Sequence, residues 1–323
     1  MILYHWQGHT PNFGDELNTL LWPRLLPGFF DDRPDARFLG IGSILDARHP
    51  RDQFKVVAGA GYAGYERKPL IDRTWIIHWV RGPMTATALG LPGTLGLGDP
   101  AMLLPLVLPC PAAQPTVIGF MPHFETLTRG PWHRAASMAG MALIDPRSPP
   151  ESVVAAIGRC RLLLSESLHG AIVADAMRVP WVAIRPLAGI HRQKWRDWAE
   201  TVDLTIRPQP LTPSSGSEWL GIGTLGRLHR VRGFIARHRH ELDVLWPERL
   251  LAGAAEGLRR AAMAEPNLST EPVLRRRQAR MMEAVAVLRR QPMQGALMAG
   301  IIVRVGTDLH QPDNSAYQLR PVG

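Results

Sequence analysis

The sequence predicts an α/β protein made of two Rossmann-like domains, and three features of the chain support this fold class. Short apolar runs alternate with segments of helical pattern, as they do in parallel sheets connected by crossover helices. Most of these runs end in glycine or small polar residues, which suit the tight loops that follow such strands. A proline-rich stretch at residues 104–115 interrupts the pattern before it starts again, so we expect it to link two doubly wound halves.

The N-terminal half is expected to contain both strands and helices in alternation. Its strands are predicted at residues 2–6, 37–41, 54–58 and 74–79. A first helix is predicted at residues 15–22. A second helix begins at Pro83, because proline suits the first turn of a helix, and it stops at Gly90.

The second half repeats the alternation. Its strands are predicted at residues 116–120, 141–144, 161–164 and 179–184, and its helices at 150–159 and 168–177. These predictions divide the chain into a first domain at residues 1–108, a second domain at 116–216 and a helical, basic extension at 217–323. The domain assignment rests on pattern alone, because no close sequence repeat relates the two halves.

The C-terminal extension contains a predicted amphipathic helix at residues 274–291. The apolar side chains that fall near one face of this helix are Leu274, Met281, Val285 and Leu288. Two interpretations stay open at this point. The helix either packs on the protein with its arginines in solvent, or lies on an anionic membrane surface.

The composition favours a folded intracellular protein. Of the 323 residues, 46% are hydrophobic and 20% are charged, so the chain can bury a large core. There is no apolar run of the roughly 18 to 20 residues that cross a membrane, and no secretory signal pattern. The two cysteines are too few for a disulfide framework. We therefore expect a cytoplasmic protein, with peripheral contact at the inner membrane face left open.

The positive charge of the chain points to anionic partners. The formal net charge is +9 and the isoelectric point is near 10.4, which suits nucleic acid, phosphorylated metabolites or anionic membranes. However, only 7% of the residues are aromatic, and no known nucleic-acid-binding module is recognisable. We therefore do not expect nucleic acid as a partner.

The turn at residues 165–170 is the strongest candidate for an anion site. Ligands of open α/β sheets bind outside the carboxyl ends of the strands, and this turn follows a predicted strand. Ser165 and Ser167 leave backbone N–H groups free at a helix N-terminus, which favours a phosphate or carboxylate. His169 either contacts that anion as a donor or general acid, or is a structural histidine bound to a backbone carbonyl. The residues alone leave both interpretations open.

Loops after other predicted strands supply further candidates. Asn12 and Gly14 lie in the first such loop, where Gly14 lets a ligand approach the backbone. Asp15 either caps the following helix or binds a sugar hydroxyl. The remaining candidates in loops of this kind are Gly42, Ser43 and His123.

Basic residues near the ends of later strands add positive charge to the same edge. Arg81 directly follows a predicted strand, and a guanidinium grips a carboxylate or phosphate at two points. Arg185 and Lys194 are the candidates in the second half. For each of the three, simple solvation at the surface is the alternative.

The sequence predicts neither a metal site nor a bound cofactor. His5 and His9 form a candidate metal pair, but no third ligand lies at a suitable spacing. Residues 59–64 match the spacing G-x-G-x-x-G, yet they follow a later strand than a dinucleotide fingerprint does. Nicotinamide chemistry is therefore not expected.

Several short motifs follow one another along the chain. In order, they are Asn12-Phe13-Gly14-Asp15, Gly40-Ile41-Gly42-Ser43, Arg81-Gly82-Pro83 with Leu89-Gly90, Gly98-Asp99-Pro100, Ser167-Leu168-His169-Gly170 with Val179-Pro180, and Lys194-Trp195-Arg196-Asp197. Taken together, they resemble the motifs of the polysaccharide pyruvyl transferase family. Each motif is weak alone, whereas the ordered set, over about residues 1–204, is fairly specific. The resemblance does not cover the basic extension.

The resemblance implies a fold similar to the glycosyltransferase B arrangement, with the active cleft between two domains. It implies phosphoenolpyruvate as the donor, a sugar as the acceptor, and a pyruvate ketal on an exopolysaccharide or another cell-surface glycan as the product. It suggests His169 as the acid or phosphate ligand, Arg81 as an anion clamp, and Asp15 as a base or acceptor ligand.

One position departs from the family pattern, and two other functions stay open. Many relatives have an arginine where this chain has Ser167, so another basic residue, such as Arg185 or Lys194, is expected to supply that charge. A sugar-nucleotide-dependent glycosyltransferase of the same fold is one alternative, although no acidic pair suited to a nucleotide ribose is evident. A basic nucleic-acid-binding protein is the other, and it predicts steeply salt-dependent binding. Whether the acceptor is lipid-linked also stays open.

Overall fold

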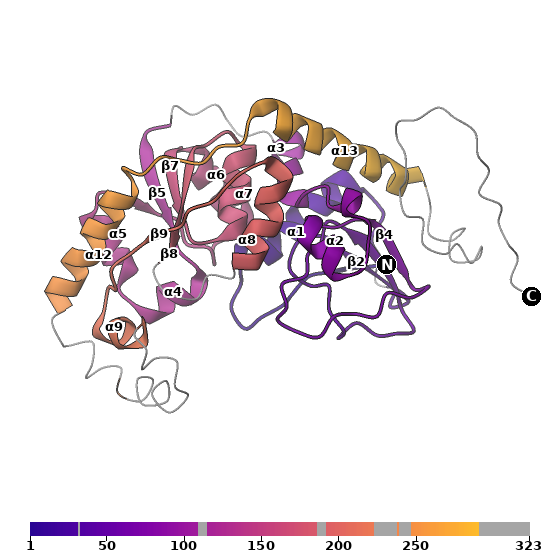
Figure 1. The fold of residues 1–323 in the computed structure, drawn as a ribbon, viewed down its shortest axis with the longest axis horizontal. Helices are drawn as coiled ribbons and strands as arrows, with labels where there is room; N and C mark the ends of the chain where they lie inside the picture. Colours follow the sequence, from indigo (N-terminus) through magenta and orange to yellow (C-terminus); the bar gives the residue numbers. More distant parts are fainter. Residues whose placement is uncertain (32, 109–114, 186–191, 223–237, 239–246, 291–323) are drawn as a thin grey trace, which may run out of the picture.

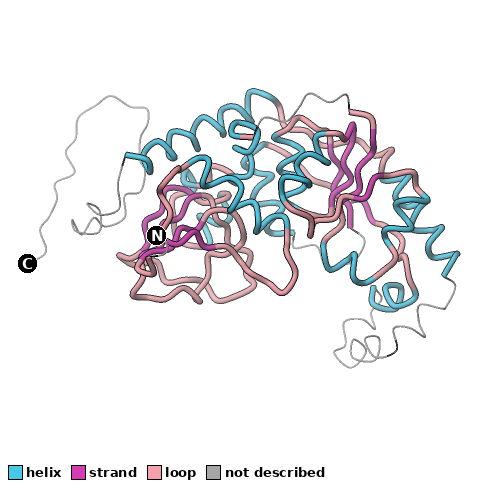
Figure 2. The backbone as a smooth tube through the Cα atoms, turned by 180° about the vertical axis from the view of Figure 1, so that it is seen from behind, coloured by secondary structure: helices cyan, strands magenta, loops and turns pink. Residues whose placement is uncertain are grey.

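The computed structural model describes the chain except for residues 32, 109–114, 186–191, 223–237, 239–246 and 291–323. It contains two parallel β-sheets with helices packed around them (Figure 1). Figure 2 shows the strands as two separate groups with helices lying between them. The predicted α/β class is confirmed, and every strand predicted from the sequence is present.

The first sheet belongs to the N-terminal half, and its strands lie side by side in the order in which they occur along the chain. Its strands are β1 (Ile2–Tyr4), β2 (Ala36–Leu39), β3 (Phe54–Ala58) and β4 (Trp75–Trp79), and they pair in parallel in the order β1-β2-β3-β4. Helix α1 (Phe13–Leu25) connects β1 to β2. The later connections, residues 40–53 and 59–74, are rich in glycine, proline and charged residues and form loops. The expected doubly wound order is therefore wrong for this half.

The second sheet is doubly wound. Its strands are β5 (Val117–Met121), β6 (Ala142–Leu143), β7 (Cys160–Ser165), β8 (Trp181–Arg185) and β9 (Gln209–Pro210), in the parallel order β6-β5-β7-β8-β9. The order reverses between β5 and β7, and ligands bind at such switch points in open α/β sheets. The helices of this half are α4 (Phe124–Arg129), α5 (Trp132–Met138), α6 (Pro150–Gly158), α7 (Leu168–Ala176) and α8 (Arg192–Ala199).

The junction between the halves is more ordered than a linker. After α2 (Pro83–Ala88), a short helical turn η1 (Gly93–Leu95) leads to η2 (Pro100–Leu103) and α3 (Leu104–Val107). The predicted linker at 104–115 is thus helical in its first part, because Pro105 falls in a first helical turn, where proline is tolerated. Its residues 109–114 lie outside the described part of the chain.

The C-terminal helices cover the outside of the molecule. They include α9 (Gly216–Ile222), α12 (Pro247–Ala261) and α13 (Glu271–Arg290), which runs across the top of Figure 1. The apolar side chains predicted on one face of α13 are all buried, namely Leu274, Met281, Val285 and Leu288. The interpretation as a helix packed on the protein is confirmed. The protein already covers the apolar face, so that face does not contact lipid, and the interpretation as a helix lying on an anionic membrane surface stays a prediction that rests on charge alone.

Helix α13 contacts both halves of the protein. Gln278 donates a hydrogen bond to the Met102 carbonyl at 2.8 Å, and Arg289 donates one to the Leu25 carbonyl at 2.8 Å, both in the first half. Arg277 donates to the Thr201 carbonyl of the second half at 2.6 Å. One apolar cluster continues through both halves, from residues such as Trp79 to residues such as Trp181. The proposed domain limits stay a prediction.

None of the described helices is long and apolar enough to cross a lipid bilayer.

Candidate active site

A cavity lies where the loops after the strands of both sheets meet. Its volume is about 260 Å³, slightly below the roughly 300–1,000 Å³ of drug-sized ligand sites. The residues that line it are Trp6, Asn12, Asp15, Gly42, Ser43, Ile44, Arg48, Tyr65, Glu66, Arg81, His123, Ser167, Leu168, His169 and Lys194. They come from both halves, so neither half could form the cavity alone.

The structure brings most of the predicted site residues together in this cavity. Those that line it are Asn12, Asp15, Gly42, Ser43, Arg81, His123, Ser167, His169 and Lys194. His123 and His169 follow β5 and β7, the strands on either side of the switch point in the second sheet. The functions assigned to these residues stay predictions.

Three predicted site residues do not line the cavity. Ser165 is fully buried, and its hydroxyl donates to the Ser167 carbonyl at 2.8 Å, so it stabilises the turn without facing the cavity. Arg185 ends β8, beside β9, outside the cavity wall. Gly14 lies against the His169 ring, and its lack of a side chain leaves space for that ring.

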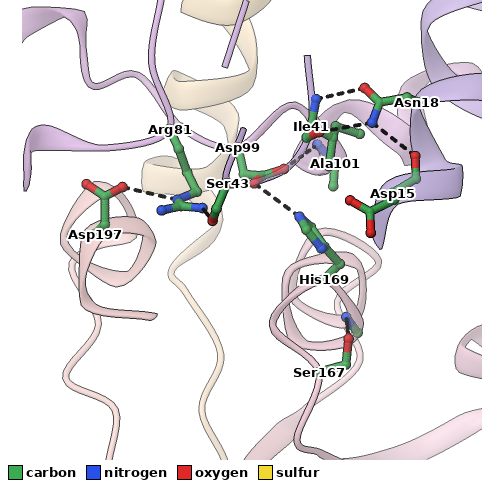
Figure 3. Close-up of polar contacts among 12 residues, drawn as sticks. Asp15, Asn18, Ile41, Ser43, Arg81, Asp99, Ala101, Ser167, His169 and Asp197 are labelled. Carbon is green, nitrogen blue, oxygen red and sulfur yellow. Dashed lines mark hydrogen bonds and ion pairs between the residues drawn. The ribbon is translucent and has the colours of Figure 1, made fainter. Parts of the chain in front are cut away.

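His169 is fixed at the N-terminus of α7 by residues of the other half. Ser167 caps this helix and accepts a hydrogen bond from the Gly170 N–H at 3.4 Å. The His169 side chain is 14% exposed, and its Nε2 atom lies 3.5 Å from Oδ2 of Asp99, which is fully buried (Figure 3). The other oxygen of Asp99 accepts from the Ala101 N–H at 3.0 Å. This arrangement places the imidazole beside a buried carboxyl group, which suits a general acid.

Gly14 makes room for the imidazole. A Cβ atom at this position of α1 would lie 1.9 Å from Nδ1 of His169. No L side chain can fit there unless the ring moves. The close contact explains why a glycine stands in the first turn of a helix, where it is otherwise unfavourable.

Gly14→Ala is expected to destabilise the protein by about 1–3 kcal/mol through overpacking, and to lower activity because the His169 ring is displaced. Denaturant unfolding and a steady-state assay measure the two effects. Gly93→Ala is the matched control, because nothing lies within 4 Å of its added Cβ, and it should change stability by less than about 0.5 kcal/mol. Equal behaviour of the two variants would contradict the packing argument.

Arg81 lines the cavity and has one buried donor atom without a partner in the described part of the chain. Its side chain is fully buried, with Nε 3.1 Å from Oδ2 of Asp197 and Nη1 donating to Ser43 Oγ at 2.7 Å (Figure 3). Among the described residues, its Nη2 atom has no hydrogen-bond partner. Buried donors are nearly always satisfied, so an anion in the cavity is a natural partner for this one.

Asp197 connects the two halves at the same place. It projects from α8 of the second half and accepts hydrogen bonds from Thr85 of α2, at 2.9 Å from the backbone N–H and 2.6 Å from the hydroxyl. The carboxylate therefore caps α2 and holds Arg81 at once. Two motifs that are distant in sequence, Arg81-Gly82-Pro83 and Lys194-Trp195-Arg196-Asp197, meet through this contact.

Asp15 is held at the opposite wall by amide side chains. Asn12 donates to its carboxylate at 2.7 Å, and burial raises its pKa above the usual value despite that bond. Asn18, also on α1, donates to the Ile41 carbonyl at 2.9 Å and accepts from the Ile41 N–H at 2.8 Å. It thereby ties the helix to the turn at Gly42, whose φ of +120° favours glycine.

Lys194 lines the cavity and interacts electrostatically with Glu166. Burial, followed by the nearby Arg81 charge, lowers the pKa of the half-buried Lys194 to about 8. Burial raises the pKa of Glu166 to about 7, although its carboxylate accepts from the His123 N–H at 2.7 Å and from Thr126 at 3.1 Å. Cationic groups in the cavity wall therefore lie near two carboxyl groups, Asp15 and Glu166, whose pKa values are both raised by burial.

Comparison with known proteins agrees with this site. A family model for polysaccharide pyruvyl transferase matches residues 68–186, which include β4 through β8. The succinoglycan biosynthesis protein ExoV of Rhizobium meliloti (strain 1021) is 38% identical over 226 residues, which are 67% of this chain and 69% of that protein. The chain belongs to the polysaccharide pyruvyl transferase family. The resemblance stated from the sequence is confirmed, and the protein is a transferase. No solved structure matches it.

Several site residues of this transferase could not be assigned a role from the sequence. Asp99 and Asp197 lie within the motifs that carry the resemblance, but only the fold shows that they contact His169 and Arg81. Trp6 and Tyr65 lie in loops without a recognised motif. The described residues contain no group of three side chains suited to a metal ion, and the absence of a metal and a cofactor stays a prediction.

Proposed function

We propose that the transferase moves the enolpyruvyl group of phosphoenolpyruvate onto a sugar of an exopolysaccharide or another cell-surface glycan, where it forms a pyruvate ketal. The observation that carries the proposal is the convergence of Arg81, Lys194 and His169 with the N-terminus of α7 on one cavity. Phosphoenolpyruvate has a phosphate and a carboxylate, and this set of donors suits both. The succinoglycan biosynthesis relative supports a polysaccharide acceptor.

The chemistry assigns a distinct task to each residue. Protonation of the donor methylene carbon makes C2 cationic, and we assign that proton to His169, oriented by Asp99. A sugar hydroxyl then attacks C2, and Asp15 accepts its proton. The C2–O bond to phosphate breaks, and phosphate leaves with the proton that Asp15 had accepted. The second hydroxyl then attacks C2 and closes the ketal, and its proton returns to His169. One donor and two hydroxyls thus give one ketal and one phosphate.

Lys194 is the residue that we propose in place of the arginine expected at Ser167. It lines the cavity, whereas Arg185 does not. Among the described residues, Lys194 has no hydrogen-bond partner, so its ammonium is available to a phosphate or carboxylate. The two-domain glycosyltransferase B arrangement is likewise our inference, supported by two parallel sheets with a cavity between their loops.

Contact with the membrane stays a prediction of its own. The exposed arginines of α13, Arg275, Arg276 and Arg280, can attract anionic lipid by charge, without insertion of the helix. That contact would bring a cytoplasmic enzyme to a lipid-linked acceptor. Loss of vesicle binding after replacement of these arginines would support it, and unchanged binding would contradict it.

The test is calorimetric titration of phosphoenolpyruvate, without added metal, over pH 7 to 9. We expect the affinity to fall above pH 8, because the pKa of Lys194 is about 8 and its ammonium is charged only below that pH. The second ionisation of a phosphate lies near pH 6, so the ligand charge is constant in this window. A bound anion keeps the lysine protonated, and the loss is therefore up to about tenfold for each pH unit above 8.

Variants of two lysines make the test specific. Lys194→Met should bind weakly at pH 7 and lose the pH dependence, whereas Lys68→Met, at an exposed lysine outside the cavity, should behave like the wild type. An unchanged pH profile in Lys194→Met would remove Lys194 from the donor site. A folded wild type that binds no phosphoenolpyruvate, with or without sugar, would contradict the proposed function.

A further inference from the structure

Two aromatic side chains stand in the cavity wall beside the charged groups. Trp6 follows β1 and is 46% exposed, and Tyr65 lies in the loop after β3 and is 51% exposed. Neither belongs to an apolar cluster of the core. Their positions are therefore not explained by burial in the core, and exposed apolar surface in a cavity commonly marks a binding site.

The indole ring of Trp6 packs against the guanidinium group of Arg48. The Arg48 guanidinium lies 4.9 Å from the centre of the Trp6 ring. Arg48 is itself held by the buried Asp46, with Nη2 and Nε at 2.6 and 3.0 Å from its two carboxylate oxygens. It also lies 3.8 Å from a carboxylate oxygen of Glu66. Trp6 therefore has a rigid support on one face while much of its surface stays open.

The loop that carries Tyr65 is held on both sides. The Tyr62 N–H donates to the Thr85 hydroxyl at 3.1 Å, and the Tyr62 hydroxyl donates to the Glu66 carbonyl at 3.0 Å. After it, the Arg67 carbonyl accepts from the Ala47 N–H at 3.0 Å. These bonds hold the backbone on both sides of Tyr65, which lowers the entropy lost when a ligand orders the loop.

These rings do not suit the donor. Phosphoenolpyruvate is anionic at both ends, and the face of an aromatic ring carries partial negative charge. A pyranose, in contrast, has a face of C–H groups that packs on an aromatic ring and a rim of hydroxyls that need polar partners. Arg48 and Glu66 line the same cavity and offer a donor and an acceptor for such hydroxyls.

We infer that Trp6 and Tyr65 form a subsite for a neutral pyranose ring of the acceptor, with Arg48 and Glu66 binding its hydroxyls. The inference rests on the proposed function, because it places the acceptor beside the donor groups. It goes beyond that function by naming which residues select the sugar. The subsite holds the ring by its C–H face and so leaves hydroxyls at its edge for reaction.

The experiment measures sugar binding directly, by saturation-transfer NMR with methyl β-glucopyranoside and methyl β-galactopyranoside, each with and without phosphoenolpyruvate. We expect at least one glycoside to bind the wild type and to bind Trp6→Ala about tenfold more weakly. Tyr65→Ala should weaken binding as well, while Tyr65→Phe, which keeps the ring, should retain most of it. Trp219→Ala is the matched control, because Trp219 is a tryptophan of similar exposure, 54%, outside the cavity.

The same variants are titrated with phosphoenolpyruvate to separate the two proposals. Donor affinity should change less than about twofold in Trp6→Ala, because the donor site is elsewhere in the cavity. Failure of the wild type to bind the donor would count against the proposed function alone, while the glycoside result still decides the subsite. Glycoside binding that is equal in the wild type and folded Trp6→Ala overturns the inference, and so does a wild type that binds neither glycoside.

Discussion

His169→Ala is expected to lower kcat by about 10²- to 10⁴-fold, the range typical of general acid–base groups. The imidazole is the group that we assign to protonation of the donor carbon, and it is held between Gly14 and Asp99. Its loss should change kcat far more than the KM for phosphoenolpyruvate, because Arg81 and Lys194 remain to bind the anion. Steady-state kinetics with a phosphate-release assay measures both constants.

Two further variants test whether the effect belongs to the proton-transfer group. Asp99→Asn retains an oxygen that accepts from the Ala101 N–H, so α7 and η2 should stay in place, but the charge beside His169 is lost. We expect a smaller fall in kcat, of about tenfold or more. His133→Ala removes an exposed histidine of α5 and should have no effect. Full activity of His169→Ala would leave the assignment without support.

Asp197→Asn is expected to reduce the free energy of unfolding by about 3–5 kcal/mol, as found when one partner of a buried ion pair is removed. Arg81 and Asp197 are both fully buried, and without the carboxylate the guanidinium keeps its charge in the interior. The amide also replaces an acceptor that serves both the N–H and the hydroxyl of Thr85. Chemical denaturation measures the change.

Asp203→Asn is the matched control for that variant. Asp203 is exposed and has a left-handed backbone, φ +56°, which asparagine also tolerates, so stability should change by less than about 0.5 kcal/mol. Addition of Arg81→Met to Asp197→Asn should recover part of the stability, because no unpaired charge stays buried. The double variant should not bind phosphoenolpyruvate, because it lacks the Arg81 guanidinium. A double variant less stable than Asp197→Asn would show that the pair does not act through its charge.

The local pattern of the sequence was sufficient to predict most elements. Alternation of apolar runs and glycine loops located the strands, and the apolar stripe of α13 located a buried face. The turn at 165–170 was recognisable because strand, small residues and helix follow one another directly. Elements with weak local signals were missed, such as β9, which has two residues and depends on its pairing with β8.

Relations between distant segments could not be predicted in the same way. The strand order of the first sheet depends on the paths of the long loops that connect its strands, and these loops have no helical pattern in the sequence. The partners Arg81 and Asp197 are 116 residues apart in sequence, and nothing near either residue indicates the other. The same holds for His169 and Asp99. Most of the cavity wall was therefore predictable, whereas the groups that orient its side chains were visible only in the fold.

The helix α13 has a consequence for how ligands meet the cavity. It is hydrogen-bonded to the first half through Gln278 and Arg289 and to the second through Arg277, so it links the two halves directly. Such a link restricts rotation of one half relative to the other. Their mutual orientation is largely fixed when the chain folds, so ligand binding costs little additional entropy for ordering the protein. We therefore expect the two halves of the enzyme to keep nearly the same spacing when a substrate binds, instead of closing around it.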